Sequence, residues 1–185
     1  MAKRVCPWWL GYVLASPLRR LAYDPAGILR PYVRPGMTVL EPGPGMGFFT
    51  LELARMVGAS GRVVAVDVQP KMIERLKRRA AKAGVLERID ARLATADSLG
   101  VADLAGRVDF TLAFAVVHEM PSSESFFAEV ARASKPGASV LFAEPAGHVK
   151  PELFEEEMQE ALEAGFALVE RPSLRRSQAA LLRRG

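Results

Sequence analysis

The chain contains a single cysteine and no asparagine among its 185 residues. The lone Cys6 excludes an internal disulfide and any metal site built from several thiolates. The absence of asparagine removes every N-glycosylation sequon. One cysteine in a chain of this length fits a reducing compartment, and we expect a cytoplasmic protein.

Long apolar runs are also lacking. No run reaches the ~18 residues of a membrane-spanning helix, so we predict no membrane span. Lys3 and Arg4 precede an apolar stretch over residues 5–15, which loosely imitates a signal peptide. Pro7 and Gly11 interrupt that stretch, and we therefore expect no export signal.

The charge balance shows no strong bias. The formal net charge is +4, half of the residues are apolar and a quarter are charged, as in ordinary globular proteins. The positive excess is mostly arginine in small clusters spread along the chain. We interpret these clusters as solvated surface rather than as a nucleic-acid site.

The most informative stretch that is present is VLEPGPGMGFFT, residues 39–50. It predicts a buried strand that ends in an acid, Glu41, followed by a turn with glycines at 43, 45 and 47 and then a helix. Gly43, Gly45 and Gly47 allow a tight turn and let a ligand approach the main chain closely. Three glycines are more than a plain turn requires, so we expect a ligand site, although a turn without a ligand is the alternative.

From residue 37 onwards the hydrophobic pattern alternates between strand and helix. Short connections between such units predict an α/β fold with a doubly wound, Rossmann-like sheet of seven strands. We expect a mostly parallel sheet with an antiparallel C-terminal strand and helices on both faces. The expected strands are 38–40, 62–67, 88–94, 108–116, 139–143, 166–170 and 178–182, and the expected helices are 48–56, 70–83, 122–133 and 151–164.

Two further acids follow the next expected strands. Asp67 ends the second strand and lies 20 residues after Gly47, where a carboxylate can accept bonds from both ribose hydroxyls of a nucleotide. Asp97 follows the third strand. The alternatives are a helix-capping role for Asp67 and a local Asx-turn for Asp97. Because ligands bind at the carboxyl ends of parallel strands, we expect Glu41, Asp67 and Asp97 to form one cradle.

Polar groups also follow the fourth and fifth strands. His118 and Glu119 come after the fourth strand, and Glu144 and His148 come after the fifth. Two histidines and two glutamates can bind a metal. They lie on separate loops without helical ligand spacing, so we expect no metal site but an acidic rim that contacts a polar or cationic substrate.

Five segments together resemble the class I S-adenosylmethionine (SAM) dependent methyltransferases. They are VLEPGPGMGFFT, VVAVDVQP, ATADSL, VDFTLAFAVVHEM and KPGASVLFAEP, in the order and spacing of that family. The resemblance covers residues 36–182 and is to the small-molecule branch, such as the enzymes that methylate quinone precursors. It implies a SAM-dependent methyltransferase that acts on a small-molecule acceptor.

The resemblance also implies roles for individual residues. The residues expected to bind SAM are Glu41, Gly43, Gly45, Gly47, Asp67, Val68, Ala96, Asp97, Ser98 and Ala115. His118 and Glu119 are the polar groups expected nearest the methyl group, and we predict them as the catalytic residues. A histidine with a near-neutral pKa is the natural proton acceptor. The alternative is that His118 only caps or supports the loop before helix 122–133.

The segment before the first strand has three interpretations. We expect residues 1–36 to form an N-terminal helical lid and residues 37–185 to form the SAM-binding domain. In this family such segments often cover the cofactor, and Trp8, Trp9 and Tyr12 would then exclude water. The alternatives are a hydrophobic plug over one end of the sheet and contact with a membrane surface.

The chain departs from the family pattern at two points. Pro44 stands in the glycine turn, and there is no large insertion before the last strands. A compact substrate pocket, or one completed by a second subunit in a homodimer, follows from that.

Other functions remain as alternatives. They are an RNA or protein methyltransferase, a non-catalytic SAM-binding module and an NAD-dependent reductase. Phe48 stands where the NAD fingerprint has its third glycine, which disfavours the reductase. The lack of asparagine excludes the Asn-Pro-Pro-aromatic motif of many amino-group DNA methyltransferases.

Overall fold

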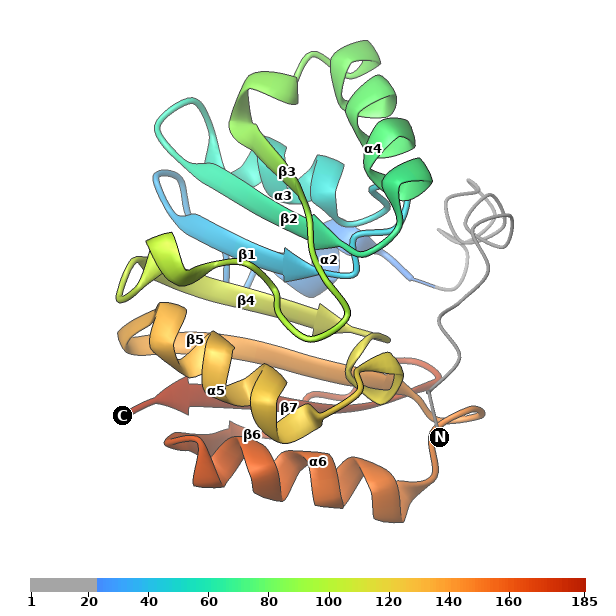
Figure 1. Ribbon diagram of the computed structural model, residues 1–185, viewed down its shortest axis with the longest axis vertical. Coiled ribbons are helices and arrows are strands. Elements are labelled where there is room, and N and C mark those ends of the chain that lie inside the picture. Colours follow the sequence, from blue (N-terminus) through green and yellow to red (C-terminus); the bar gives the residue numbers. More distant parts are fainter. Residues whose placement is uncertain (1–22) are drawn as a thin grey trace. The chain divides into compact units, whose positions relative to one another are not determined.

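The structure is a computed structural model that describes residues 23–185 (Figure 1). The predicted lid residues Trp8, Trp9 and Tyr12 lie outside the described residues, so the lid stays a prediction. The first described helix is α2 (Pro25–Leu29). The side chain of Asp24 caps it by accepting a hydrogen bond from the Ala26 N–H at 3.1 Å.

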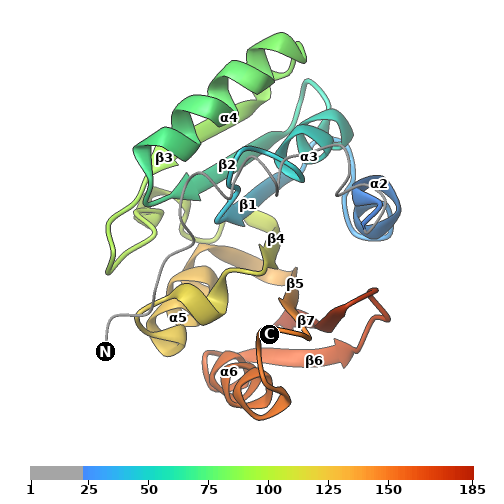
Figure 2. The same cartoon turned by 90° about the vertical axis from the view of Figure 1, so that its right-hand side faces the viewer.

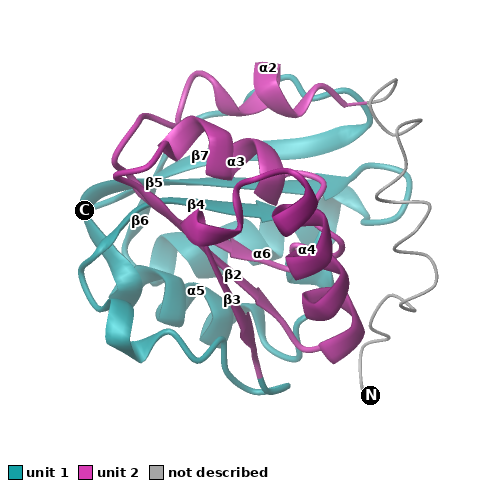
Figure 3. Ribbon diagram, turned by 90° about the horizontal axis from the view of Figure 1, so that it is seen from above, with its two compact units in different colours: residues 1–4, 95–185 teal, residues 5–94 magenta. Residues whose placement is uncertain are grey.

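Seven strands form one mixed sheet in the order β3-β2-β1-β4-β5-β7-β6, which confirms the predicted Rossmann-like α/β class. The strands are β1 (Thr38–Pro42), β2 (Arg62–Asp67), β3 (Ile89–Leu93), β4 (Val108–Phe114), β5 (Ser134–Pro145), β6 (Phe166–Glu170) and β7 (Ser177–Arg184). The antiparallel strand is β7, which pairs with both β5 and β6. The chain divides into two compact units, coloured separately in Figure 3, and each is described by itself.

Among the described residues, unit 2 comprises 23–94. Strands β1, β2 and β3 run parallel, and β2 lies between the other two. The expected run of apolar residues in β2 is buried from Val63 to Val66, as a strand covered on both faces requires. Helices α3 (Thr50–Val57) and α4 (Pro70–Lys82) connect the strands and pack on them through Leu53 and Leu76, both fully buried.

Among the described residues, unit 1 comprises 95–185 and holds strands β4 to β7. Helices α5 (Ser123–Ala133) and α6 (Pro151–Glu163) lie side by side (Figures 1 and 2). Their core is aromatic: Phe142 of β5 stacks on Phe154 of α6 at 4.7 Å between ring centroids and meets Phe127 of α5 edge-on at 5.5 Å. This packing fixes β5, the strand whose end carries Glu144.

Several boundaries differ from the sequence prediction. Strand β1 extends to Pro42 rather than to 40, β7 extends to Arg184 rather than to 182, and α3 begins at Thr50 rather than at 48. Strand β4 ends at Phe114 rather than at residue 116, because Ala115 adopts a φ of 56° and leaves the extended conformation. Strand β5 begins at Ser134 rather than at 139. The expected turn at residues 135–137 is instead an irregularity within β5, where the register with β4 shifts and Gly137 has a φ of 76°.

Three short 3₁₀ turns were not foreseen. They are η2 (Leu86–Arg88), η3 (Ala102–Leu104) and η4 (Val117–Glu119). The last of these carries the predicted catalytic residues. Within residues 23–185, no helix has the length and apolar character needed to cross a bilayer.

Candidate functional site

The glycine turn in unit 2 follows β1 directly. Glu41, next to the last residue of that strand, is 3% exposed, and the Gly43 N–H donates to the Val66 carbonyl at 2.9 Å. Gly43, Gly45 and Gly47 all have positive φ values, of 65°, 54° and 84°. Left-handed backbone of this kind favours glycine at each of these positions.

Two of these glycines face different surroundings. A Cβ added at Gly47 would lie 2.5 Å from Leu76 Cδ1, so this glycine allows α4 to pack against the turn. Among residues 23–185, a Cβ added at Gly45 would meet nothing within 4 Å. Bare main chain that faces open space beside a buried acid is the arrangement that the sequence predicts for a ligand cradle.

Asp67 closes β2 and is 8% exposed. Its Oδ1 accepts a hydrogen bond from the N–H of Gln69, the N-cap residue of α4, at 2.9 Å. The carboxylate therefore stabilises the turn into α4, which is the structural role that the sequence left open. The next residue, Val68, is 38% exposed.

In unit 1, an acid of α5 holds the loop that carries Asp97. Ala96, Asp97 and Ser98 are exposed. Glu129 accepts hydrogen bonds from the Ser98 hydroxyl and from the Leu99 N–H, both at 3.1 Å. The Ser98 oxygen accepts the Gly100 N–H at 3.1 Å, so this hydroxyl serves the loop itself in the structure. Sequence reasoning missed Glu129, because helical periodicity gives no sign of which loop an acid reaches.

The end of β4 changes direction sharply at Ala115. Its φ of 56° is one of two positive values at non-glycine residues in the described chain. The Ala115 N–H donates to the Ala143 carbonyl at 2.7 Å, so β4 and β5 stay paired up to the bend. The chain then enters η4 with Val117 and His118. A residue other than glycine in this conformation costs about 1 kcal/mol or more, which the surroundings must offset.

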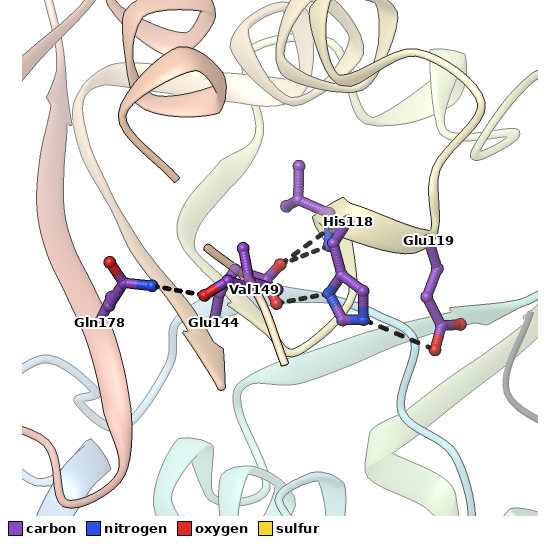
Figure 4. Close-up of polar contacts among 6 residues, drawn as sticks. His118, Glu119, Glu144, Val149 and Gln178 are labelled. Carbon is purple, nitrogen blue, oxygen red and sulfur yellow. Dashed lines mark hydrogen bonds and ion pairs between the residues drawn. The ribbon is translucent and has the colours of Figure 1, made fainter. Parts of the chain in front are cut away.

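Glu144 supplies that support from β5. Its side chain is completely buried. Oε1 accepts hydrogen bonds from the Val117 N–H at 2.8 Å and the His118 N–H at 3.3 Å, and Oε2 lies 2.6 Å from His118 Nδ1 (Figure 4). The sequence placed Glu144 on an acidic rim; the structure instead makes it an interior anchor of the loop.

His118 lies between two carboxylates. Its side chain is 12% exposed, and Nε2 is 4.0 Å from Oε1 of Glu119 on the side opposite Glu144. Burial lowers the pKa of His118. The hydrogen bond to Glu144 and the negative charges of Glu144, Glu119 and Glu157 outweigh that effect, so the pKa is raised above the usual 6.5.

The loop after β5 brings the second histidine to the first. The rings of His118 and His148 meet edge-on with centroids 5.1 Å apart. The same loop is held by Gln178 of β7, which donates to the Val149 carbonyl at 3.0 Å (Figure 4). Among residues 23–185, no group of three or more His, Cys, Asp or Glu side chains has an arrangement that could hold a metal ion.

The predicted site residues thus form two sets. Unit 2 carries Glu41, the three glycines, Asp67 and Val68, and unit 1 carries Ala96, Asp97, Ser98, Ala115, His118 and Glu119. Within unit 1 the structure joins His118 and Glu119 to Glu144 and His148. It holds the Asp97 loop through Glu129.

Comparisons with known proteins point in one direction. A family model described as a methyltransferase domain matches residues 34–177. The chain is 34% identical over 110 residues to an arsenite methyltransferase of Halobacterium salinarum, covering 60% of this chain and 27% of that protein. It is 30% identical over 127 residues to a ubiquinone/menaquinone biosynthesis C-methyltransferase of an Enterobacter species, covering 68% and 47%.

A solved structure matches almost the whole chain. It is described as a SAM-dependent methyltransferase from Aquifex aeolicus, with a TM-score of 0.86 and 23% identity, covering 97% of this chain and 98% of that one. At this identity the likeness concerns the fold. The chain spans between about a quarter and a half of the length of the two curated relatives described above.

Proposed function

Because the chain belongs to the methyltransferase-domain family, we propose that it is a SAM-dependent methyltransferase that acts on a small-molecule acceptor. The observation that carries the proposal is the family match over residues 34–177, which includes the glycine turn and every strand end predicted to hold SAM. Its relatives, an arsenite methyltransferase and quinone-biosynthesis C-methyltransferases, act on small molecules according to their names.

The residues of unit 2 fit an adenosyl cofactor. The open main chain at Gly45 leaves room for a ligand against the turn. The buried carboxylates at Glu41 and Asp67 are acceptors suited to hydroxyl and ammonium groups. In unit 1 the exposed Asp97 is an acceptor suited to the exocyclic amine of an adenine.

When bound, SAM supplies a methyl group on a sulfonium, which an acceptor atom attacks in line. His118 takes the proton of the acceptor at Nε2, and Glu119 stabilises the imidazolium that results. The raised pKa of His118 makes it a stronger base than an ordinary histidine, although it is neutral only at higher pH. We therefore expect an acceptor that must lose a proton, such as a phenol or an acidic carbon.

Arsenite is a less suitable acceptor for this chain. The 185 residues contain one cysteine, Cys6, whereas binding of arsenite by several thiolates needs more than one. A quinone-precursor type of acceptor agrees better with a histidine base.

Binding of the demethylated cofactor is the first test. Titration calorimetry with S-adenosylhomocysteine should show binding to the wild-type chain and a loss of at least about tenfold in affinity for Gly45→Ala, since the new methyl group would occupy ligand space. The matched control is Gly84→Ala, because Gly84 also has a positive φ, 68°, and open surroundings but lies at the end of α4. No binding by the wild type at high micromolar concentration would reject the proposal.

Turnover is the second test. A panel of phenolic and quinol acceptors should release S-adenosylhomocysteine with the wild type, and His118→Ala should lower kcat by about 100-fold or more. Binding without turnover on any acceptor would favour a non-catalytic SAM-binding module. Turnover on RNA or protein alone would favour an RNA or protein methyltransferase.

We also propose a cytoplasmic location and a homodimer. The single cysteine supports the location. The terminal strand β6 supports the dimer, because among the described strands it pairs with β7 alone, and Leu168 and Val169 are 41% and 46% exposed. Light scattering at micromolar concentration should give twice the mass of one chain, and Leu168→Lys should halve it; a monomeric wild type would reject the dimer.

A further inference from the structure

We propose that Glu144 is a positioning residue that holds the neutral imidazole of His118 as the tautomer with its proton on Nδ1, so that Nε2 presents a lone pair to the acceptor. This inference rests on the proposed function only for its consequence in catalysis. The tautomer itself follows from the contacts within unit 1.

A carboxylate can accept hydrogen bonds but cannot donate them. Glu144 faces three nitrogen atoms, the main-chain nitrogens of Val117 and His118 and the ring Nδ1 of His118, at 2.8, 3.3 and 2.6 Å. The two main-chain groups are donors by necessity. Since a carboxylate opposes Nδ1, that nitrogen must also be a donor, which leaves Nε2 of the neutral ring without a proton.

Because Glu144 is buried, the three hydrogen-bond donors around its carboxylate are needed. Glu144 has no exposed surface, and it follows four fully buried residues of β5 from Val140 to Ala143. A buried charge is costly unless donors satisfy it. The three contacts from the η4 segment supply those donors, so losing one of them would leave part of the charge without compensation.

The backbone brings the donors to the carboxylate. Phe114 pairs with Ala143 in the parallel register of β4 and β5, and the Ala115 N–H donates to the Ala143 carbonyl. The positive φ of Ala115 then turns the chain. As a result, the N–H groups of residues 117 and 118 meet the next side chain of β5, which is that of Glu144.

The opposite side of the ring is arranged differently. Glu119 Oε1 is 4.0 Å from Nε2, which is beyond hydrogen-bond distance. The titratable groups that face His118 are Glu144 of β5, Glu119 of η4, Glu157 of α6 and His148 of the loop after β5. The negative charges of the three glutamates favour the imidazolium. Removal of its first proton from Nε2 gives the basic form.

Nitrogen NMR of the wild-type chain tests the tautomer directly. The chain contains two histidines, so ¹⁵N labelling gives two ring systems, and a His148→Gln variant assigns them. At a pH above the His118 transition, we expect a protonated Nδ1 and an unprotonated Nε2. A protonated Nε2, or an even mixture of the two tautomers, would overturn the inference. This measurement needs no cofactor, acceptor or turnover.

A Glu144→Gln variant tests the cause. The amide oxygen of the new side chain can still accept the Val117 N–H, but its NH₂ group now donates to Nδ1 and moves the ring proton to Nε2. We expect the reversed tautomer, a lower pKa for His118, and a kcat reduced by about 100-fold with S-adenosylhomocysteine affinity within about twofold of wild type. Glu124→Gln, on the exposed start of α5, is the control.

The outcomes separate this inference from the proposed function. An unchanged tautomer and an unchanged His118 pKa in Glu144→Gln would reject the positioning role, whatever the activity. A wild type that does not bind S-adenosylhomocysteine would reject the proposed function and leave the tautomer result standing. If Glu144→Gln does not fold, the wild-type spectrum decides.

Discussion

Two turns at the ends of parallel strands redirect the chain in different ways. In unit 2 the turn after β1 uses glycines at 43, 45 and 47, each with a positive φ. In unit 1 the segment after β4 uses Ala115 and is held by a carboxylate 27 residues away from Val117. The first turn bends through its own glycines and contacts β2 through the main chain, whereas the second depends on a side chain of a neighbouring strand. The first therefore leaves bare main chain, and the second places a side chain.

The two kinds of turn suit two different chemical tasks. Bare main chain at Gly45 suits a large ligand that lies against the backbone. A proton acceptor needs a fixed orientation of its side chain, and Glu144 provides this for His118 through its ring nitrogen. Removing each kind of support in turn tests whether the two turns differ in this way.

The largest effect is expected from Glu144→Ala. It leaves the Val117 N–H buried without its acceptor and removes the partner of His118, so we expect the free energy of unfolding to fall by about 3 kcal/mol. Denaturant unfolding measures the loss, and Glu156→Ala on the exposed side of α6 is the control. A loss similar to that of the control would mean that the second turn does not depend on β5.

The next effect concerns the glycine turn. Gly47→Ala combines an unfavourable φ of 84° with a contact of 2.5 Å to Leu76, and we expect about 2 kcal/mol of destabilisation. Gly45→Ala shares the positive φ but meets open space, and should cost about 1 kcal/mol. Thermal unfolding of both variants compares the two positions. Equal losses would show that packing against α4 does not distinguish them.

A smaller effect is expected at a third loop, which also relies on a remote carboxylate. Glu129→Gln weakens the bonds to Ser98 and the Leu99 N–H, so the Asp97 loop loses part of its order. We expect about fivefold weaker binding of S-adenosylhomocysteine, which corresponds to roughly 1 kcal/mol. Calorimetry measures it beside Glu124→Gln on the same helix, and an affinity equal to that control would contradict the prediction.

The smallest effect is a dependence of stability on pH. The folded state raises the pKa of His118 above its ordinary value of 6.5, through Glu144 and the nearby acids and against the effect of burial. The protonated form therefore stabilises the fold fully below about pH 6.5, and this contribution disappears as the pH rises through the folded pKa. Melting temperatures of wild type and His118→Gln should converge with rising pH. A gap that widens with pH would contradict the assigned direction.

The contrast also explains what the sequence could predict. The glycine turn is a local pattern, and alternating apolar segments reveal β2, α4 and α6 almost to the residue. The fold class could be predicted because it depends on the order of these locally recognisable elements. The roles of Glu144 and Glu129 were missed, because each acts on a loop more than 25 residues away in the chain.

The predicted limits of β4 and β5 were wrong because the local backbone conformation departs from the strand pattern. The apolar run through Val116 predicts that β4 continues, and nothing in the residue type of Ala115 signals a positive φ. Likewise, Lys135-Pro136-Gly137 has the composition of a turn, yet it forms an irregularity within β5. Both cases depend on pairing between β4 and β5, which sequence periodicity does not contain.

Strand β5 reaches its final surroundings late in synthesis. In the antiparallel register of β5 and β7, Glu144 lies opposite Gln178. Strand β7 is the strand of unit 1 that the ribosome produces last. While a nascent chain emerges, β5 therefore has an unoccupied edge for the time needed to make more than 30 further residues. The carboxylate that holds His118 can be sealed in its protein environment only after translation has passed β7.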